Sequence, residues 1–227
     1  MNRKIRGTYF APLYASGSKD ISQRALFGNK IAKHNFRDEF LEILAQRLSL
    51  ERTQDGLPSR LSPEDIFQYA YAVFYSPEYR RRYAEYLKID FPRLPLTCNL
   101  ELFRALGRLG GELVALHLLE SPQLDEPLTE YVGGRSPEVE AISWSKNTVW
   151  LDKAQTSGFK GVCEDVWNFP IGGYQVCEKW LKDRKGRALS AADRTHYQKI
   201  VVALHETIRI MADIDRVIEK HGGWPLK

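Results

Sequence analysis

The chain has 227 residues, of which 43% are hydrophobic and 27% charged, the composition of an ordinary soluble globular protein. It has no apolar run of about 18 residues and no secretory h-region near its start, which argues against a membrane span and an exported precursor. Its three cysteines lack metal-type spacing, and an odd count argues against a disulfide framework, so we expect a reducing cytoplasm.

The net charge is +4, but the charge is unevenly distributed. Residues 1–37 hold eight Lys or Arg and one acid, and residues 178–187 hold five cations and two acids. Residues 100–140 hold three arginines and eight acids. Such polarity suits a protein with one face on nucleic acid and another on protein or solvent, although accidental patchiness is the alternative.

The first half of the chain is predicted to be mainly helical. Short strands and loops are expected in residues 1–35, followed by an amphipathic helix over 36–50. Ser62-Pro63 and Ser76-Pro77 each combine a capping serine with a proline at the first helical position. They predict helices to about Tyr75 and Lys88.

Residues 90–96 contain two prolines and are expected to be extended. A long helix is predicted over 100–119, interrupted or bent near its glycines, Gly107, Gly110 and Gly111. Prolines and glycines after Ser121 indicate a boundary or mobile connection. This divides the chain into a mainly helical part, 1–120, with a basic N-terminal segment, and a part with a β-hairpin or sheet and C-terminal helices, 121–227.

The second part begins with strand patterns. Residues 139–144 and 148–151 alternate and are β-rich, which predicts a hairpin with a cationic, amide-bearing tip. Strands are also expected at 158–162 and 166–171. A final helix from the cap Ser190 to about Lys220 carries an apolar stripe that must pack on another helix. The overall expectation is an α+β fold, with a small mixed β-sheet and several long packed helices.

Residues 169–187 predict a short strand, a turn and a helix with cations near its end. Gly172 and Gly173 permit turn conformations or close approaches that a side chain would block. We expect one inward helical face, formed by Tyr174, Cys177, Trp180 and Leu181. The cations lie mostly off this face, which suits phosphate contact; a solvated helix with a basic end is the alternative.

Motifs for catalysis are absent from the sequence. It contains no Pro-Pro dipeptide, as an amino-methyltransferase turn would need, no Gly-x-Gly and no Gly-Lys. His205-Glu206 begins a zinc-protease-like motif, but Arg209 stands at the position of the second histidine. Cys163 and Cys177 lack an obvious paired histidine. The sequence therefore predicts a chain that does no catalysis by itself.

Three ordered stretches carry a resemblance to a known family: residues 61–96, then 102–106 with 111–119, then 167–187 continuing into 197–218. From residue 61 to residue 218, they are spread over about two thirds of the chain. They resemble the C-terminal specificity region of type ISP restriction–modification enzymes, single polypeptides that join nuclease, ATP-driven translocase, adenine methyltransferase and DNA-recognition parts.

The resemblance implies a target-recognition-like fold with helical spacer elements, and sequence-specific recognition of double-stranded DNA in a prokaryotic, cytoplasmic phage-defence system. The expected partners are duplex DNA and the methyltransferase and helicase portion of the same or a neighbouring polypeptide. No cofactor is expected in this chain, because AdoMet, ATP and Mg²⁺ would bind in the associated catalytic domains. A protein-interaction domain in a defence complex, and a nuclease or hydrolase with an unrecognised site, remain alternatives.

Recognition divides into cations that hold phosphates and polar side chains that read base edges. Candidate phosphate contacts are Lys182, Arg184, Lys185, Arg187 and, more weakly, Arg80, Arg81 and Arg82. Candidate base readers lie on the hairpin tip and the following loop: Lys146, Asn147, Lys153, Gln155, Thr156 and Lys160. Asn and Gln pair naturally with adenine, while Lys suits guanine.

Overall fold

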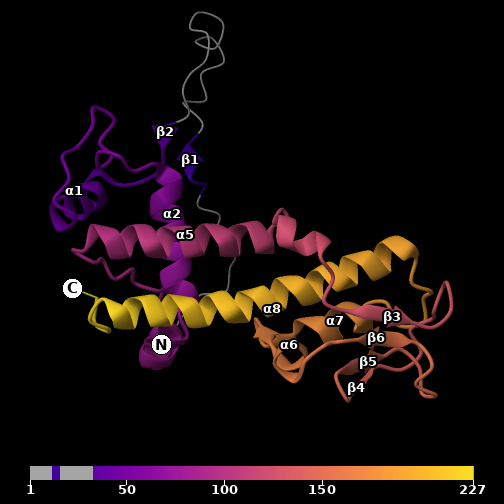
Figure 1. Ribbon diagram of the computed structural model, residues 1–227. Helices are drawn as coiled ribbons and strands as arrows, with labels where there is room; N and C mark the ends of the chain where they lie inside the picture. Colours follow the sequence, from indigo (N-terminus) through magenta and orange to yellow (C-terminus); the bar gives the residue numbers. More distant parts are fainter. Residues whose placement is uncertain (1–11, 16–32, 227) are drawn as a thin grey trace, which may run out of the picture.

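A computed structural model describes residues 12–15 and 33–226, which form an α+β arrangement (Figure 1). The helices are α1 Asp38–Arg47, α2 Pro63–Tyr75, α3 Pro77–Arg82, α4 Ala84–Leu87, α5 Leu100–His117, α6 Glu164–Asn168, α7 Val176–Lys182 and α8 Ala191–Lys220, with a 3₁₀ turn η2 at Pro122–Asp125. The strands are β1 Tyr14–Ala15, β2 Lys33–His34, β3 Glu130–Val132, β4 Ser143–Ser145, β5 Thr148–Trp150, β6 Gly158–Lys160, β7 Pro170–Ile171 and β8 Tyr174–Gln175. Short strands are expected in residues 1–35, and the described part of this segment contains β1 and β2, which pair antiparallel. The rest of the basic N-terminal segment, residues 1–11 and 16–32, lies outside the described residues.

Local capping signals fix the starts of the predicted helices. Before α2, the Ser62 hydroxyl accepts a hydrogen bond from the Asp65 amide, and the Asp65 carboxylate accepts one from the Ser62 amide. Ser190 and Asp193 form the same capping box before α8. Each box satisfies amide groups that a helix start would otherwise leave unpaired. The expected second helix divides at Tyr83 into α3 and α4.

Three long helices form the helical layer. In Figure 1, α5 and α8 run side by side and α2 crosses them. Of the expected interruption or bend near the glycines of α5, the interruption is wrong, since the helix is continuous from Leu100 to His117. A Cβ on Gly110 would lie 1.9 Å from the Gln68 carbonyl oxygen, so this glycine allows the backbones of α5 and α2 to approach closely.

The main sheet has four strands in the order β3-β6-β5-β4, and all of its pairings are antiparallel, so the expected sheet is small but not mixed. The predicted hairpin is β4–β5, with Trp144 opposite Val149. Val149 lies opposite Phe159, whose ring centre is 4.5 Å from that of Tyr197 on α8. One face of the sheet is therefore buried against the N-terminal half of α8.

Two expectations for residues 166–175 need correction. Residues 164–168 form α6, so only Pro170 and Ile171 remain from the predicted strand. Gly172 and Gly173 have φ of 59° and 87° and close the β7–β8 hairpin, with open space around both. Tyr174 lies in β8 and is 62% exposed, so it does not share the inward helical face.

Two buried hydrophobic clusters lie along α8. One includes residues of α1, α2 and α5 and continues to Val202, Ile210, Ile214 and Ile218 of α8. The other joins the sheet, α6 and α7 to Tyr197, Val201 and Leu204. The boundary near residue 120 stays a prediction, but α8 contributes to both clusters. None of the described helices is long and apolar enough to cross a membrane.

Candidate nucleic-acid interface

The connection from α7 to α8 carries four of the predicted phosphate ligands. Lys182 forms an ion pair with Glu178 at 2.8 Å. The Arg184 guanidinium lies 3.5 Å from the centre of the Trp180 ring and donates to the Trp180 carbonyl. Lys185 and Arg187 are exposed, and neither side chain has an ion pair within the described part of the chain. These two are therefore the cations that a phosphate can approach without breaking a contact.

The weaker phosphate candidates on α3 are held by contacts within α3 and with the end of α2. Arg81 and Arg82 both contact the Glu78 carboxylate, at 2.7 and 3.2 Å. Arg80 lies over the Tyr75 ring and donates to the Phe74 carbonyl. Arg81 binds through two nitrogens, and its hydrogen bonds lower the pKa of Glu78.

These three arginines are remote from α7. Asp215 of α8 contacts Ser76 and Glu78 at the start of α3, whereas α7 contacts α8 at His196. At 1.5 Å per residue, positions 196 and 215 lie roughly 28 Å apart along α8. Arg80, Arg81 and Arg82 therefore do not join the cations of residues 182–187 in one cluster.

The hairpin tip presents Lys146 and Asn147. Both have positive φ, 48° and 56°, as a two-residue hairpin turn requires. The Asn147 carbonyl accepts hydrogen bonds from the amides of Gly161 and Val162, which fixes the turn against β6 and leaves the two side chains exposed. Lys160 pairs with Thr148 in register and thus lies at the same end of the sheet.

The other predicted base readers lie at the opposite end of β5. The Asp152 carboxylate organises the β5–β6 loop by accepting from the Thr156 hydroxyl and amide and from the Ser157 amide. Lys153 lies 3.7 Å from Glu140, and Gln155 is exposed with a φ of 55°. The structure therefore separates Lys153, Gln155 and Thr156 from Lys146, Asn147 and Lys160.

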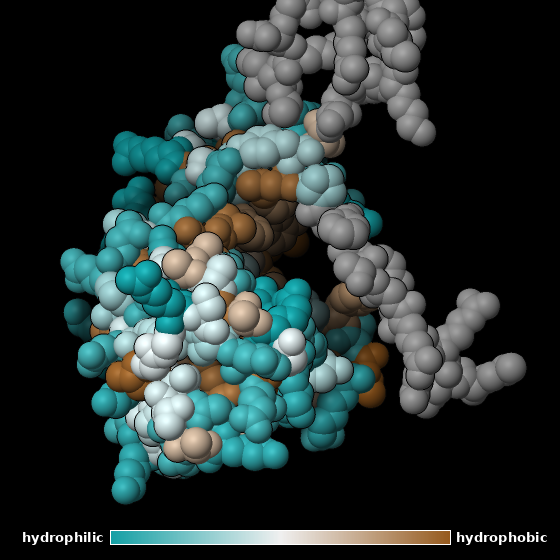
Figure 2. All heavy atoms as spheres, turned by 90° about the vertical axis from the view of Figure 1, so that its right-hand side faces the viewer, coloured by the Kyte–Doolittle hydropathy of each residue, from teal (hydrophilic) through white to brown (hydrophobic). Residues whose placement is uncertain are grey.

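One segment connects this loop to the α7–α8 cations. The Leu151 carbonyl accepts from the amides of Glu140 and Ala141, while Val139 exchanges backbone hydrogen bonds with Gly186 and Arg187. Residues 139–141 thus lie between the start of the loop and the cationic connection. Figure 2 looks onto this end of the molecule, where mainly hydrophilic residues cover the surface.

The sequence interpretation did not identify the outer face of the sheet as a candidate surface. Trp150 points to the face opposite Val149, where it donates to the Ser145 hydroxyl and lies against Gly158. A Cβ on Gly158 would come within 3.0 Å of the Trp150 ring and 2.4 Å of the Val149 carbonyl oxygen. The alternation of residues 148–151 would have assigned Trp150 to this face.

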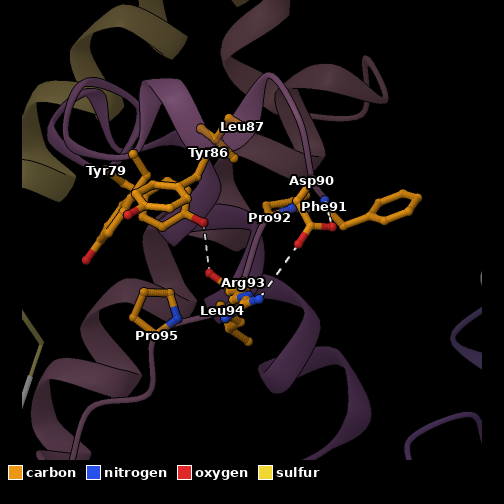
Figure 3. A pocket seen from close by; sticks show the side chains of 10 residues that line it. Tyr79, Tyr86, Leu87, Asp90, Phe91, Pro92, Arg93, Leu94 and Pro95 are labelled. Atoms are coloured by element: carbon orange, nitrogen blue, oxygen red, sulfur yellow. Dashed lines mark hydrogen bonds and ion pairs between the residues drawn. The ribbon is translucent and has the colours of Figure 1, made fainter. Parts of the chain in front are cut away.

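A pocket of about 440 Å³ lies beside α3 and α4 (Figure 3). Aromatic and proline side chains line most of it, and Tyr79 donates to the Arg93 carbonyl at its edge. Tyr86, Ile89 and Phe91 nearby are 69%, 79% and 57% exposed. An exposed apolar surface of this kind suits contact with a protein rather than with phosphates.

Two of the titratable groups named from the sequence, Cys177 and Glu206, have structural roles. Burial raises the pKa of the Cys177 thiol to about 12, which leaves it protonated and unreactive. Glu206 binds Arg209 at 2.7 Å, and Arg209 also binds Asp213. Across residues 12–15 and 33–226, no group of three His, Cys, Asp or Glu side chains is placed to hold a metal ion.

His117 lies in a polar network between three helices. Its Nδ1 is 2.7 Å from the Tyr71 hydroxyl and its Nε2 is 2.9 Å from the Thr207 hydroxyl. Thr207 donates its proton to the Ala203 carbonyl, so Nε2 donates to Thr207 and Nδ1 accepts from Tyr71. Burial, with a smaller contribution from Arg80, lowers the pKa of His117. The neutral imidazole is therefore a structural link, as a helix histidine usually is.

Comparisons with known proteins give a family and a fold. A family model described as the type ISP C-terminal specificity domain matches residues 2–213. The chain is similar to a solved structure of a nuclease-deletion mutant of the type ISP restriction–modification enzyme LlaGI in complex with a DNA substrate mimic. The two share 20% sequence identity and a TM-score of 0.51, and the similarity covers 69% of this chain and 14% of that chain. No curated protein matches.

Two further solved structures are similar. The ATP-dependent type ISP restriction–modification enzyme LlaBIII bound to DNA shares 18% identity and a TM-score of 0.58, over 83% of this chain and 12% of that chain. The DrdV–DNA complex shares 20% identity and a TM-score of 0.58, over 79% of this chain and 20% of that chain. The chain thus spans a fifth or less of the length of these three solved chains, and the likeness is one of fold.

Proposed function

The chain belongs to the family of type ISP C-terminal specificity domains, and we propose that it recognises a target sequence in double-stranded DNA for a restriction–modification system. The observation that carries this proposal is the position of Lys185 and Arg187, two exposed cations without ion pairs in the described residues. Their backbone segment is hydrogen-bonded to Val139. The next two residues of the chain, 140 and 141, are hydrogen-bonded to the start of the polar β5–β6 loop. Phosphate-holding and base-reading groups are thus neighbours, as duplex recognition requires.

The phosphate contacts divide by availability. Lys185 and Arg187 are free to bind phosphate directly. Lys182 would first leave Glu178, and this exchange is inexpensive because an exposed ion pair contributes only about 0–1 kcal/mol. Arg184 is stacked on Trp180, so its role is to support the helix end.

The base readers form two groups on one short sheet. Asn147, with Lys146 and Lys160, lies at one end of β5, and Gln155, with Lys153 and Thr156, lies at the other. About five residues of extended chain separate the two groups, which places them roughly 16 Å apart. On DNA this distance corresponds to about five base pairs at roughly 3.4 Å each. We expect the two groups to contact different positions of one target rather than the same base pair.

The proposal is tested by measuring duplex affinity against salt concentration. Lys185→Ala and Arg187→Ala should weaken binding similarly on all sequences and each reduce the log–log salt slope by about 1. Asn147→Ala and Gln155→Ala should instead reduce the preference for the cognate site, by roughly 1–3 kcal/mol for a lost bidentate contact. Arg216→Gln on α8 removes one charge that is already paired with Asp213 and serves as the control.

Two results would contradict the proposal. Absence of duplex binding at low ionic strength would remove DNA as the partner. Binding that does not weaken with salt would exclude phosphate contacts as its basis, because such contacts release counterions. If Asn147→Ala and Gln155→Ala both bind DNA with full sequence preference, base reading belongs to another surface, while the proposed role in DNA binding stands.

The chain is proposed to be non-catalytic by itself and to act with a methyltransferase and helicase portion of the same or a neighbouring polypeptide. AdoMet, ATP and Mg²⁺ would then bind in that portion. The exposed Tyr86, Ile89 and Phe91 support a second role in protein contact, because a polar partner such as DNA would not cover them.

The protein contact has its own test. Tyr86→Ser and Phe91→Ser should abolish co-purification of this chain with the methyltransferase and helicase portion, while leaving duplex binding unchanged. Ile171→Ser, on the exposed β7–β8 hairpin, is the matched control. Unchanged co-purification of both variants would exclude this surface as the contact.

A further inference from the structure

Three arginines from two separate parts of the chain line a pocket of about 240 Å³. Arg60 precedes α2, and Arg104 and Arg108 lie one turn apart on α5. Leu61, Phe103 and Gly107 supply an apolar lining, and Asp65 and Gln68 of α2 complete it. The sequence interpretation placed Arg104 and Arg108 in the acidic region 100–140 and did not single them out.

The positive charge of this pocket is not neutralised by the described residues. All three arginines are exposed, and none has an ion pair there. Arg104 and Arg108 occupy positions i and i+4, where like charges destabilise a helix. Asp65 also lines the pocket, and its carboxylate accepts hydrogen bonds from the amide and hydroxyl of Ser62 in the capping box. The pocket therefore has three guanidinium groups that form no ion pair with the described carboxylates.

The backbone at Arg60 is also unusual. Its φ is 65°, in the left-handed region that residues other than glycine rarely adopt. Such conformations persist where the surrounding structure holds them, and they concentrate at ligand-binding sites. Here the conformation places an arginine, rather than a glycine or asparagine, at the edge of the pocket.

We propose that this pocket binds a phosphate group, namely one of the DNA backbone, at a second contact separate from the sheet. Guanidinium groups match phosphate oxygens in paired, charge-assisted hydrogen bonds. The pocket is smaller than the roughly 300–1,000 Å³ of small-molecule sites, which suits a phosphate better than a whole nucleotide. The assignment to the DNA backbone rests on the proposed function, whereas the phosphate chemistry rests on the three arginines.

The test compares the full chain with an Arg104→Gln/Arg108→Gln double variant. Affinity for a labelled duplex is measured across a salt series, on a cognate and a scrambled sequence. Lys88→Gln/Arg216→Gln, which removes the same charge from surface ion pairs elsewhere, is the control. Thermal stabilisation of the DNA-free protein by inorganic phosphate is measured in parallel, because it reports phosphate binding independently of DNA.

We expect the pocket variant to bind both duplexes about tenfold more weakly than the control variant, and its salt slope to be smaller by about 0.9 for one lost phosphate. It should also lose the stabilisation by inorganic phosphate. Loss of that stabilisation with unchanged duplex binding would assign the pocket to free phosphate. Unchanged behaviour in both assays would overturn the proposal, even if the sheet variants still bind DNA as proposed above. Absence of duplex binding by the wild-type chain would contradict the proposed function and, with it, the assignment to the DNA backbone. The phosphate assay would then decide whether the pocket binds phosphate at all.

Discussion

Replacing two glycines of α5 separately should give opposite effects on stability. A Cβ on Gly110 would lie 1.9 Å from the Gln68 carbonyl oxygen and 2.7 Å from its carbonyl carbon, both backbone atoms of α2. These atoms cannot rotate away, so α5 and α2 must separate and disturb the core that contains Leu106 and Leu113. By contrast, a Cβ on Gly107 would be 3.8 Å from the Asp65 carbonyl oxygen, an ordinary contact.

The magnitudes follow from two opposing contributions. Alanine is favoured over glycine inside a helix by about 0.8–1.0 kcal/mol, and Gly107→Ala should gain most of this. Overpacking costs typically about 1–3 kcal/mol and sometimes more, and the short backbone contact places Gly110→Ala at the upper end. We therefore expect a net loss of about 2 kcal/mol for Gly110→Ala.

Thermal denaturation of both variants measures the difference. For a chain of this size, 1 kcal/mol corresponds to about 2–4 °C in Tm, so Gly107→Ala should raise Tm by about 2–4 °C and Gly110→Ala should lower it by about 4–8 °C. Gly111→Ala should fall between them, since its Cβ would meet only the Gln68 side chain, at 3.1 Å. Equal stability of the Gly107 and Gly110 variants would refute the close approach of α5 and α2.

Three further predictions concern α7 and α8 and the buried histidine. Trp180→Ala should lower the free energy of unfolding by about 2–3 kcal/mol. This is less than the roughly 3–5 kcal/mol expected for a fully buried tryptophan, because the ring is half-buried against Arg184. Abolished duplex binding with an unchanged Tm would instead place Trp180 in the interface. Ser190→Ala should lower the free energy of unfolding by about 0.5–2 kcal/mol, because it removes the capping box before α8. Urea titration measures this change, and an unchanged free energy of unfolding would mean that the cap does not stabilise the chain. Because burial lowers the pKa of His117 in the folded chain, the unfolded chain binds the proton more readily, and wild-type stability should fall as pH decreases below about 6.5. His117→Gln should show a smaller loss between pH 7 and 5, and an identical pH profile would exclude His117 as its source.

Local sequence patterns determined much of the fold. The Ser62 and Ser190 capping signals predicted where α2 and α8 begin, and the alternation around residues 146–147 predicted the hairpin. These predictions succeeded because capping, helical periodicity and two-residue turns depend on neighbours within a few positions. The basic composition of residues 178–187 likewise pointed to Lys185 and Arg187, the cations without ion pairs in that connection.

Long-range packing decided the rest. Whether Gly110 breaks α5 or admits α2 depends on a backbone 42 positions earlier in the chain. The surroundings of a cation also depend on its neighbours in space, so Arg60 and Arg108 meet at one pocket although they are far apart in the sequence. Charge and amphipathic pattern are properties of the sequence, but ion pairing, helix approach and the joining of distant arginines arise only when the chain is folded.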